Sequence, residues 1–296
     1  MSLDPGFLLA DKAGGWTSHD VVAKARRITG IRKIGHAGTL DPMATGLLVL
    51  GVGSATRLLR YVTDLPKEYE AVARFGVATD SLDADGEITG QEPMDFDQEA
   101  LEQTMRGFLG DIRQTPPMVS AVKVGGKRLH ELARKGEEVE RPARAVLVNR
   151  LELEEFMPGE YPLVRFRVVA GKGFYVRVLA DDLAKQLGGR AHLTCLRRVA
   201  SGHLRVEDAL TIEQMSQIGG ENRPAGAMIP PGHALSHLPA LEVDATTAGW
   251  IRNGRKLERP SGWEIGRGSV RIMAEGQMLA VYRAGEDVLL PEVVLS

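Results

Sequence analysis

The sequence predicts a protein of mixed α and β structure with a smaller, β-rich domain at its C-terminal end. Through most of the chain, apolar residues two apart, typical of strands, alternate with apolar residues three or four apart, typical of amphipathic helices. Residues 219–239 are rich in Gly, Pro and Ala, which predicts a linker. Short strand-like runs separated by turn signals follow this segment. We therefore expect a large domain over residues 1–238 and a small domain over residues 239–296.

The elements can be predicted in order along the chain. The first helix is expected to begin at Thr17 or Ser18, whose side chains can cap it, and to end at Gly30, which adopts left-handed backbone angles without strain. Taken alone, the alternation of strands and helices also permits a parallel sheet. Strands are predicted over residues 7–10, 47–50, 69–77 and 163–169 and near residues 270, 278 and 289, and further helices over residues 55–62, 96–109, 176–187 and 245–251.

The composition favours a soluble, cytoplasmic protein. Of its 296 residues, 43% are hydrophobic and 26% are charged, which is ordinary for a globular chain. No apolar run is long enough to span a bilayer, and the N-terminus lacks a secretion signal. The single cysteine, Cys195, cannot form an internal disulfide, and its apolar neighbours predict a buried thiol. A net charge of −2 does not indicate nucleic-acid binding, so any prediction of such binding depends on local clusters of basic residues.

One loop, residues 35–46, has the composition of a functional site. It carries a single carboxylate, Asp41, among glycines and small residues that let a ligand approach the main chain. Pro42 restrains the backbone on both of its sides, which limits how Asp41 can move. Basic residues precede the loop and predict an electropositive approach to it. The alternative is an ordinary tight turn, in which Asp is common.

Two further residues stand out for their positions. Tyr69 lies in a predicted strand, where an aromatic residue more often packs in the core than takes part in chemistry. Arg177 lies in the first turn of a predicted helix, where the helix dipole does not favour a positive charge. A carboxylate partner would hold Arg177 there, and Asp181 one turn later is the local alternative.

A basic segment over residues 114–148 begins with two adjacent prolines that force an extended backbone. It includes Lys123, Arg141 and Arg144 and is interrupted by glycines. One interpretation is an exposed, charged hairpin. The other is an insertion that closes over the phosphates of RNA.

Residues 81–92 imitate part of a calcium-binding loop, with oxygen-bearing residues at loop positions 1, 3 and 5, Gly at 6 and Glu at 12. Position 1 is Ser81 rather than Asp, and the flanks predict a strand and a proline instead of two helices. The pattern therefore lacks the context that such a motif needs, and no metal site is predicted.

The Asp41 loop resembles, nearly residue for residue, the G-H-x-G-x-L-D-P-x-A-T-G signature of the bacterial tRNA pseudouridine synthases that modify uridine 55 in the T-loop. Residues 67–69, 114–123 and 192–198 resemble further segments of that family in the same order, and the last part of the chain resembles its small RNA-binding PUA domain. Three positions depart from the family pattern: Ala13 stands where a proline is usual, and Val119 and His130 stand where aromatic residues are usual.

The resemblance implies an α+β fold with a mixed, largely antiparallel sheet and flanking helices, plus a small PUA-like β domain. It implies a cofactor-free isomerase that converts uridine 55 of tRNA to pseudouridine, acting as a monomer on the T-stem-loop without metal or membrane. In the family pattern, Asp41 is the nucleophile, Arg177 forms an ion pair with it, and Tyr69 stacks on the base or transfers a proton. The expected substrate-binding residues are His36, Leu196, Lys12, Lys123, Arg141 and Arg144.

The chemistry requires an ionised carboxylate near the ribose, and an adjacent Arg177 is expected to lower the pKa of Asp41. The carboxylate can attack C1′, add to C6 or remove the C2′ proton, and the sequence does not choose among these. The target base has to be flipped out, with His36 filling the space that it leaves and Leu196 lining the pocket.

The alternative function is an RNA-binding protein or tRNA chaperone that acts without catalysis. An aspartyl-phosphate enzyme is disfavoured, because no phosphate loop or acidic metal-binding cluster accompanies Asp41.

Overall fold

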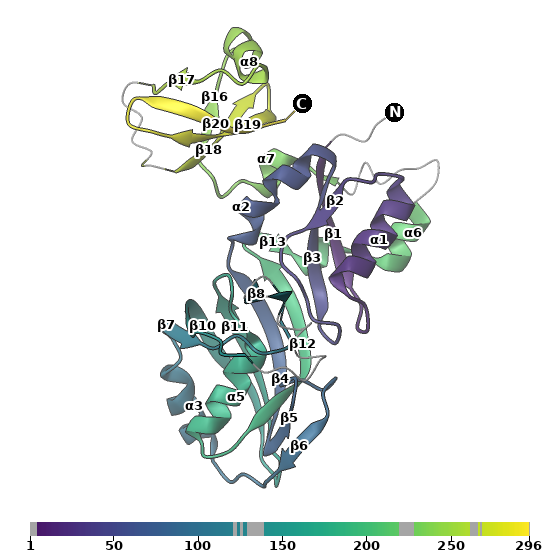
Figure 1. Cartoon of the computed structure of the whole chain (residues 1–296), viewed down its shortest axis with the longest axis vertical. Coiled ribbons are helices and arrows are strands. Elements are labelled where there is room, and N and C mark those ends of the chain that lie inside the picture. Colours follow the sequence, from purple (N-terminus) through teal and green to yellow (C-terminus); the bar gives the residue numbers. More distant parts are fainter. Residues whose placement is uncertain are drawn as a thin grey trace.

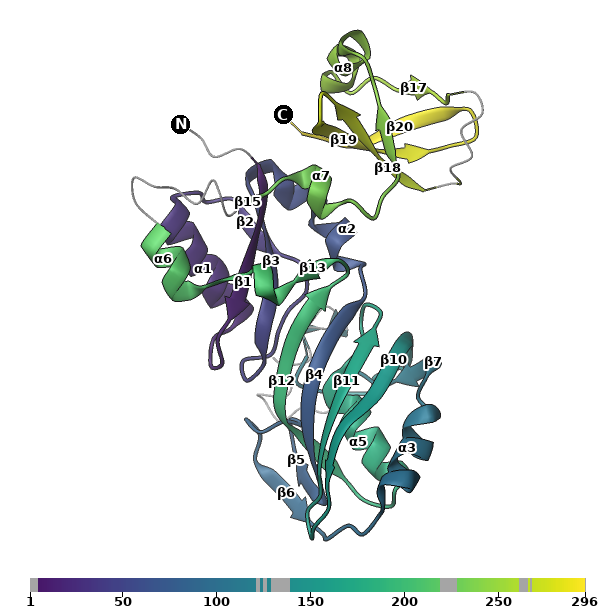
Figure 2. The same ribbon diagram turned by 180° about the vertical axis from the view of Figure 1, so that it is seen from behind.

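The computed structural model describes residues 5–120, 123–124, 127–128, 139–218, 228–260, 266 and 268–295. The described residues form an eleven-stranded sheet, a separate five-stranded sheet and two short hairpins, with helices on the sheets (Figure 1). The larger sheet extends through two lobes of the molecule, and the five-stranded sheet lies beyond one end of it (Figures 1 and 2).

The larger part of the chain contains these elements in order: β1 (Gly6–Lys12), α1 (Ser18–Thr29), β2 (Ile34–His36), β3 (Thr45–Val52), η1 (Gly53–Leu58), α2 (Leu59–Thr63), β4 (Lys67–Phe75), β5 (Val77–Thr79), β6 (Ile88–Gln91), α3 (Gln98–Arg106), β7 (Gly110–Gln114), β8 (Lys123–Val124), β9 (Lys127–Arg128), β10 (Arg144–Met157), β11 (Leu163–Ala170), α5 (Val176–Gln186), β12 (Ala191–Ser201), β13 (Leu204–Arg205), η2 (Val206–Asp208), β14 (Leu210–Thr211), α6 (Ile212–Ile218), β15 (Met228–Ile229) and α7 (Pro231–Ala234). The C-terminal part contains β16 (Ala240–Glu242), α8 (Ala245–Arg252), β17 (Leu257–Glu258), β18 (Ser269–Ala274), β19 (Gln277–Ala284) and β20 (Val288–Val294).

The large sheet is mixed and mostly antiparallel, as the family resemblance implies. Its main strand order is β14-β1-β3-β12-β4-β11-β10-β7, with β2, β13 and β15 paired at its sides. The pairs β1–β14 and β3–β12 are parallel, and the other pairs of this sheet are antiparallel. The fully parallel sheet that the alternation of elements also permitted is therefore wrong. The parallel contact of β3 with β12 brings the strand after the Asp41 loop beside the segment that contains Leu196.

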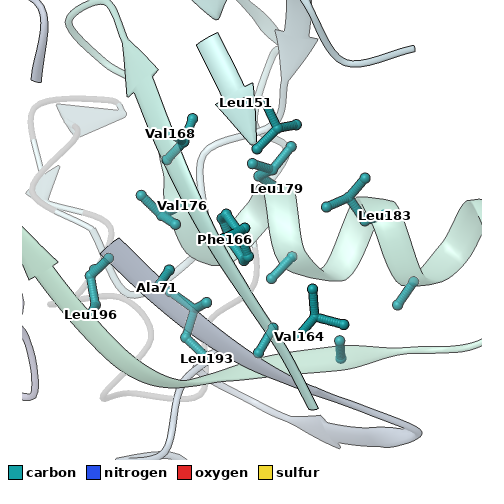
Figure 3. Close-up of a cluster of buried hydrophobic side chains, with 14 of the residues drawn as sticks. Ala71, Leu151, Val164, Phe166, Val168, Val176, Leu179, Leu183, Leu193 and Leu196 are labelled. Carbon is teal, nitrogen blue, oxygen red and sulfur yellow. The ribbon is translucent and has the colours of Figure 1, made fainter. Parts of the chain in front are cut away.

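One lobe has its core between the sheet and two helices. Helices α3 and α5 lie on one face of β4, β10, β11 and β12, and Figure 2 shows these strands from the opposite face. Burying a large apolar side chain stabilises the fold by roughly 1.5–3 kcal/mol, so this cluster fixes α5 and the residues at its start. The side chains that meet here include Val176, Leu179 and Leu183 from α5 and Val164, Phe166, Leu193 and Leu196 from the strands (Figure 3).

The first helix has the ends that its sequence predicts. Thr17 is the N-cap, and its side chain and that of Asp20 each accept a hydrogen bond from the other residue's backbone N–H. Gly30 follows the helix at φ 72° and donates its N–H to the Arg26 carbonyl, which ends α1. The polypeptide then turns back through β2 toward the Asp41 loop.

Other local predictions needed correction. Gly76, at φ +81°, separates β4 from β5 within the predicted strand over residues 69–77, and α3 is shorter than the predicted helix over residues 96–109. Cys195 is exposed rather than buried. The pairing of β12 with β4 shifts register between Leu193 and Cys195, so this irregularity buries Leu193 and Leu196 and turns Cys195 outward.

The five-stranded C-terminal sheet has the order β16-β18-β19-β20-β17 and begins at Ala240. The predicted linker is only partly tested, because residues 219–227 lie outside the described part of the chain. Within the remainder of that segment, Pro231–Ala234 form the short helix α7, and Ala234 and Leu235 are buried in an apolar cluster that also contains residues of both sheets. The boundary between residues 238 and 239 stays a prediction.

Candidate active site

The structure fixes the Asp41 loop from both sides of the carboxylate. Ser18 Oγ accepts a hydrogen bond from the Leu40 N–H at 2.9 Å, and the Gly15 N–H donates to the Pro42 carbonyl at 2.9 Å. Lys12 Nζ also donates to the Pro42 carbonyl at 3.0 Å. The backbone around Asp41 is therefore held by the start of α1 and by the turn before it.

Lys12 was expected to bind substrate, but its side chain is fully buried. Besides Pro42, its ammonium donates to the carbonyls of Ala13 and Trp16, at 2.9 and 2.7 Å. Burial lowers the Lys12 pKa to about 8, and the charge of Asp41 opposes this shift. Direct substrate contact by Lys12 is therefore excluded in this conformation, because its nitrogen is committed to holding the loop.

Arg177 reaches Asp41 from the first turn of α5. Its Nε lies 3.1 Å from Asp41 Oδ2, so the carboxylate contact expected from the sequence is present. Arg177 is 1% exposed, and its guanidinium donates to three further acceptors: Asp83 Oδ2 at 3.0 Å, the Ser81 carbonyl at 2.7 Å and the Val119 carbonyl at 2.9 Å. These fixed partners leave the guanidinium little freedom, so Arg177 presents a fixed positive charge to Asp41.

The local alternative for Arg177 is wrong. Asp181 instead accepts hydrogen bonds from Arg190 Nε, at 2.7 Å, and forms an ion pair with Lys185 at 2.9 Å. The distant carboxylates Asp41 and Asp83 take its place beside Arg177.

The pKa of Asp41 shifts in the direction opposite to the expected one. Burial at the base of a pocket raises the pKa of the Asp41 carboxyl above 3.8, Arg177 opposes that rise, and the negative charge of Asp83 adds to it. Two carboxylates share one guanidinium, so Arg177 does not compensate Asp41 fully. The Asp41 side chain is nevertheless 33% exposed, which leaves it accessible to a substrate.

Asp41 opens into a pocket of about 380 Å³. Four residues predicted from separate parts of the sequence line it together: Asp41, Tyr69, Arg177 and Leu196. Tyr69 is half-buried on β4, beside the apolar cluster, and Leu196 lies on the neighbouring strand β12 at one end of that cluster (Figure 3). A pocket with an apolar wall, an aromatic ring and one carboxylate can hold a planar base against a reactive group.

The pocket also contains residues that sequence reasoning did not assign. Arg198 is buried and donates from Nε to the Leu47 carbonyl at 2.7 Å and from Nη2 to the Gly38 carbonyl at 3.1 Å. Burial lowers the pKa of Lys67 to about 8, and the positive charge of Arg198 acts in the same direction. The Lys67 ammonium donates to the Val62 and Leu65 carbonyls. Burial raises the pKa of Tyr175, and the charge of Asp41 acts in the same direction. Lys67 and Arg198 could have been predicted as pocket residues, because both lie in segments that resemble the family, residues 67–69 and 192–198.

Asp83 is the main partner that the sequence did not predict. It belongs to the segment that imitates a calcium loop, yet its carboxylate accepts hydrogen bonds from Arg177, the Ser81 hydroxyl and the Asp85 N–H. Across the residues that the structure describes, no group of three His, Cys, Asp or Glu side chains is arranged to hold a metal ion. Asp83 instead supports the arginine of the pocket.

Among the residues whose side chains the structure describes, the predicted substrate-binding residues His36, Arg141 and Arg144 do not line this pocket. His36 ends β2 beside the loop, and burial lowers its pKa while the nearby His19, whose ring centre is 5.6 Å away, acts in the same direction. Arg141 donates to the Pro116 carbonyl at 3.2 Å, and Arg144 is exposed at the start of β10. Lys123 lies in the short strand β8, and His130 lies outside the described residues. No helix in the described part of the chain is long and apolar enough to cross a membrane.

Comparison with known proteins gives consistent matches. A family model described as "TruB family pseudouridylate synthase (N terminal domain)" matches residues 26–176. A protein named tRNA pseudouridine synthase B from Geobacillus thermodenitrificans is 42% identical over 284 residues, which cover 94% of each chain. A protein of the same name from Aromatoleum aromaticum is 42% identical over 292 residues, covering 98% of this chain and 92% of the relative.

Two solved structures share the fold. A chain of a Cbf5-Nop10-Gar1 complex matches with a TM-score of 0.79 and 27% identity, over 100% of this chain and 86% of that chain. A chain of an H/ACA RNP bound to a substrate RNA containing 2′-deoxyuridine matches with a TM-score of 0.74 and 25% identity, over 98% of this chain and 85% of that chain. The mixed sheet and the carboxylate pocket, together with these matches, define an enzyme of the pseudouridine synthase class. Within that class, the chain belongs to the TruB family of pseudouridylate synthases.

Proposed function

We propose that this chain converts uridine 55 in the T-loop of tRNA to pseudouridine, with Asp41 as the nucleophile. The observation that carries the proposal is the Asp41 carboxylate, held 3.1 Å from a buried Arg177 and partly exposed at the base of a pocket. Relatives that cover nearly the whole chain are named tRNA pseudouridine synthase B, which supports tRNA as the substrate.

The reaction needs only groups that this pocket contains. The bond between C1′ and N1 of uridine breaks, the uracil turns, and a bond forms between C5 and C1′. The proton lost from C5 is balanced by the proton gained at N1, so no electrons are exchanged with a cofactor. In the proposed mechanism Asp41 forms a temporary covalent bond with the substrate, and Tyr69 stacks on the uracil and assists the proton transfer at C5.

The target base has to leave its stacked position in the T-loop before it reaches Asp41. Such flipping costs on the order of a few kcal/mol, which binding of the base in the pocket has to offset. Leu196 supplies an apolar wall for the flipped base, while His36 lies outside the pocket, beside the loop that carries Asp41. Because burial lowers its pKa, His36 is neutral at physiological pH and suits the apolar space that the base leaves.

The test is a single-turnover assay on a T-stem-loop RNA, with pseudouridine mapped at each position. Asp41→Asn should lose at least about 10³-fold in rate while RNA binding is retained, because the covalent step loses its nucleophile. Asp182→Asn is the control, because Asp182 is partly exposed, pairs with Lys185 and does not line the pocket, so this variant should react as fast as the parent. Turnover of Asp41→Asn within tenfold of the parent, or pseudouridine at a different position, would contradict the proposal.

The alternative, a tRNA chaperone that acts without catalysis, rests on the basic segment around Arg141 and Arg144. It predicts that refolding of tRNA is insensitive to Asp41→Asn and is impaired by Arg141→Gln or Arg144→Gln. The same variants can be compared in both assays, so the two functions can be separated or found together.

A further inference from the structure

The mouth of the pocket carries one cation that the catalytic arrangement does not use. Among the described residues, four basic side chains line the pocket: Lys67, Lys172, Arg177 and Arg198. Three of them are buried and bind groups of the protein itself. Lys172 differs, because its side chain is 68% exposed.

Lys172 forms an ion pair across the pocket mouth. Its Nζ lies 2.8 Å from Oδ1 of Asp64, whose side chain is 60% exposed and which follows the last residue of α2. An exposed ion pair of this kind stabilises a protein by only about 0–1 kcal/mol, so a stronger anion can replace the carboxylate. The pair joins the end of α2 to the turn before α5.

The turn that carries Lys172 is anchored at Gly171 and has open space at Gly173. The Gly171 N–H donates to the Leu147 carbonyl at 2.8 Å, which fixes one end of the turn to β10. Gly173 has φ +82°, and a Cβ added to it would meet no atom within 4 Å, so space is open around it. Lys172 therefore lies between Gly171, which is hydrogen-bonded to β10, and Gly173, which has open space around it. Arg177 is held separately by the buried face of α5.

We propose that Lys172 binds a backbone phosphate next to the flipped uridine and releases Asp64 when RNA binds. This inference rests on the proposed function, since a flipped base takes its two flanking phosphates to the mouth of the pocket. Those phosphates need a cation there, and Lys172 is the exposed cation of the pocket wall. Asp64 then competes with the phosphate for Lys172, so that its effect on RNA binding acts through Lys172.

The test measures RNA affinity as a function of salt in the Asp41→Asn background, so that turnover does not interfere. Loss of one phosphate contact to single-stranded RNA lowers the slope of log K against log salt by about 0.7. Lys172→Gln should show this loss together with about three- to tenfold weaker binding, and Lys172→Arg should restore both. Lys185→Gln is the control, because Lys185 is an ion-paired lysine with an exposed side chain, bound to Asp181 and Asp182 at 2.9 Å each, that does not line the pocket.

Two further measurements separate a phosphate contact from a structural effect. Asp64→Asn should tighten binding when Lys172 is present and have no effect when Lys172→Gln is present. RNA with a neutral methylphosphonate at one of the two positions flanking the target uridine should bind the parent and Lys172→Gln equally well.

The assignment is overturned if Lys172→Gln has the same salt slope as Lys185→Gln, or if Asp64→Asn acts equally in both backgrounds. Failure of the parent protein to form pseudouridine would instead contradict the proposed function. A protein that forms pseudouridine and shows no Lys172 effect loses only this inference.

Discussion

At the scale of single residues, the pocket depends on how two carboxylates share one arginine. Asp41 faces the opening, whereas Asp83 is buried behind it, and both contact the guanidinium of Arg177. If one of these carboxylates is removed, the buried arginine keeps its positive charge, and the remaining carboxylate does not fully compensate it. Asp83 therefore orients Arg177, and through it Asp41, without reaching the substrate itself.

Replacing Asp83 tests this arrangement. We expect Asp83→Asn to lower the free energy of unfolding by about 3 kcal/mol, because a buried ion pair is broken from one side. Catalytic turnover should fall at least tenfold while RNA affinity changes little. Chemical denaturation and single-turnover rates measure the two effects, with Asp182→Asn, at a partly exposed carboxylate, as the control. An Asp83→Asn protein as stable and active as the control would show that Asp41 alone is sufficient to hold Arg177.

The acid dependence of the rate follows from the raised pKa of Asp41. In the proposed mechanism Asp41 has to be ionised to act as the nucleophile, so the rate should fall as the pH decreases through that pKa, with a midpoint above the 3.8 of an ordinary Asp. Removing the charge of Asp83 should move the midpoint down, since that charge adds to the rise. Single-turnover rates across the acid range, measured where the protein stays folded, give the midpoint. A midpoint at or below 3.8 in the parent would contradict this account.

At the scale of elements, the site depends on a close approach of two strands. Gly46 is the second residue of β3 and the last residue of the Asp41 loop, with φ +98°, and a Cβ added there would lie 2.2 Å from the Arg198 carbonyl oxygen on β12. Only glycine permits both the backbone angle and this contact. The β3–β12 pairing in turn sets how far the Asp41 loop lies from Leu196.

Gly46→Ala should therefore disrupt the site as well as the stability. We expect a loss of about 3 kcal/mol or more in the free energy of unfolding, from the strained backbone angle and the separation of the strands. Gly90→Ala is the control, because an added Cβ at this position meets no atom within 4 Å. Thermal unfolding of the two variants compares them. Equal melting temperatures would mean that β3 and β12 can separate without cost.

The elements themselves were predictable from local patterns to different degrees. Helix α1 has a capping box and a terminal glycine, so both of its ends could be predicted from the sequence. The strand over residues 69–77 was predicted as one element, because nothing local shows that Gly76 turns the chain there. The exposure of Cys195 depends on a register irregularity between two strands that are far apart in sequence. The pattern of apolar residues within β12 does not indicate how β12 pairs with β4.

At the scale of the whole molecule, the C-terminal sheet packs on both of its faces. Tyr282 of β19 lies in the core beneath α8, whereas Val281, on the opposite face, lies in a cluster with Leu58 and Val62 of the larger part. The Tyr61 hydroxyl donates to Glu292 Oε2 at 2.7 Å across the same contact. The two parts therefore share an apolar interface.

Val281→Ala should weaken this interface, and Val270→Ala provides a control on the other face. Each change removes buried apolar volume, at a cost of about 1–3 kcal/mol. We expect faster amide exchange in both β19 and α2 for Val281→Ala. For Val270→Ala, faster exchange should appear only within the C-terminal sheet. Unchanged exchange in α2 for Val281→Ala would show that the two parts do not stabilise each other.

By itself, the sequence determined the mixed α and β composition, the ends of α1 and the loop that restrains Asp41, because these depend on neighbours a few residues apart. It also indicated that Arg177 needs an acidic partner, since a positive charge at a helix start requires compensation. It takes the three-dimensional structure to show that Asp41 and Asp83 share Arg177, that Lys12 holds the loop and that burial outweighs Arg177 in setting the Asp41 pKa. Each of these depends on distances between distant segments, and on water displaced from between them, which no local pattern in the sequence records.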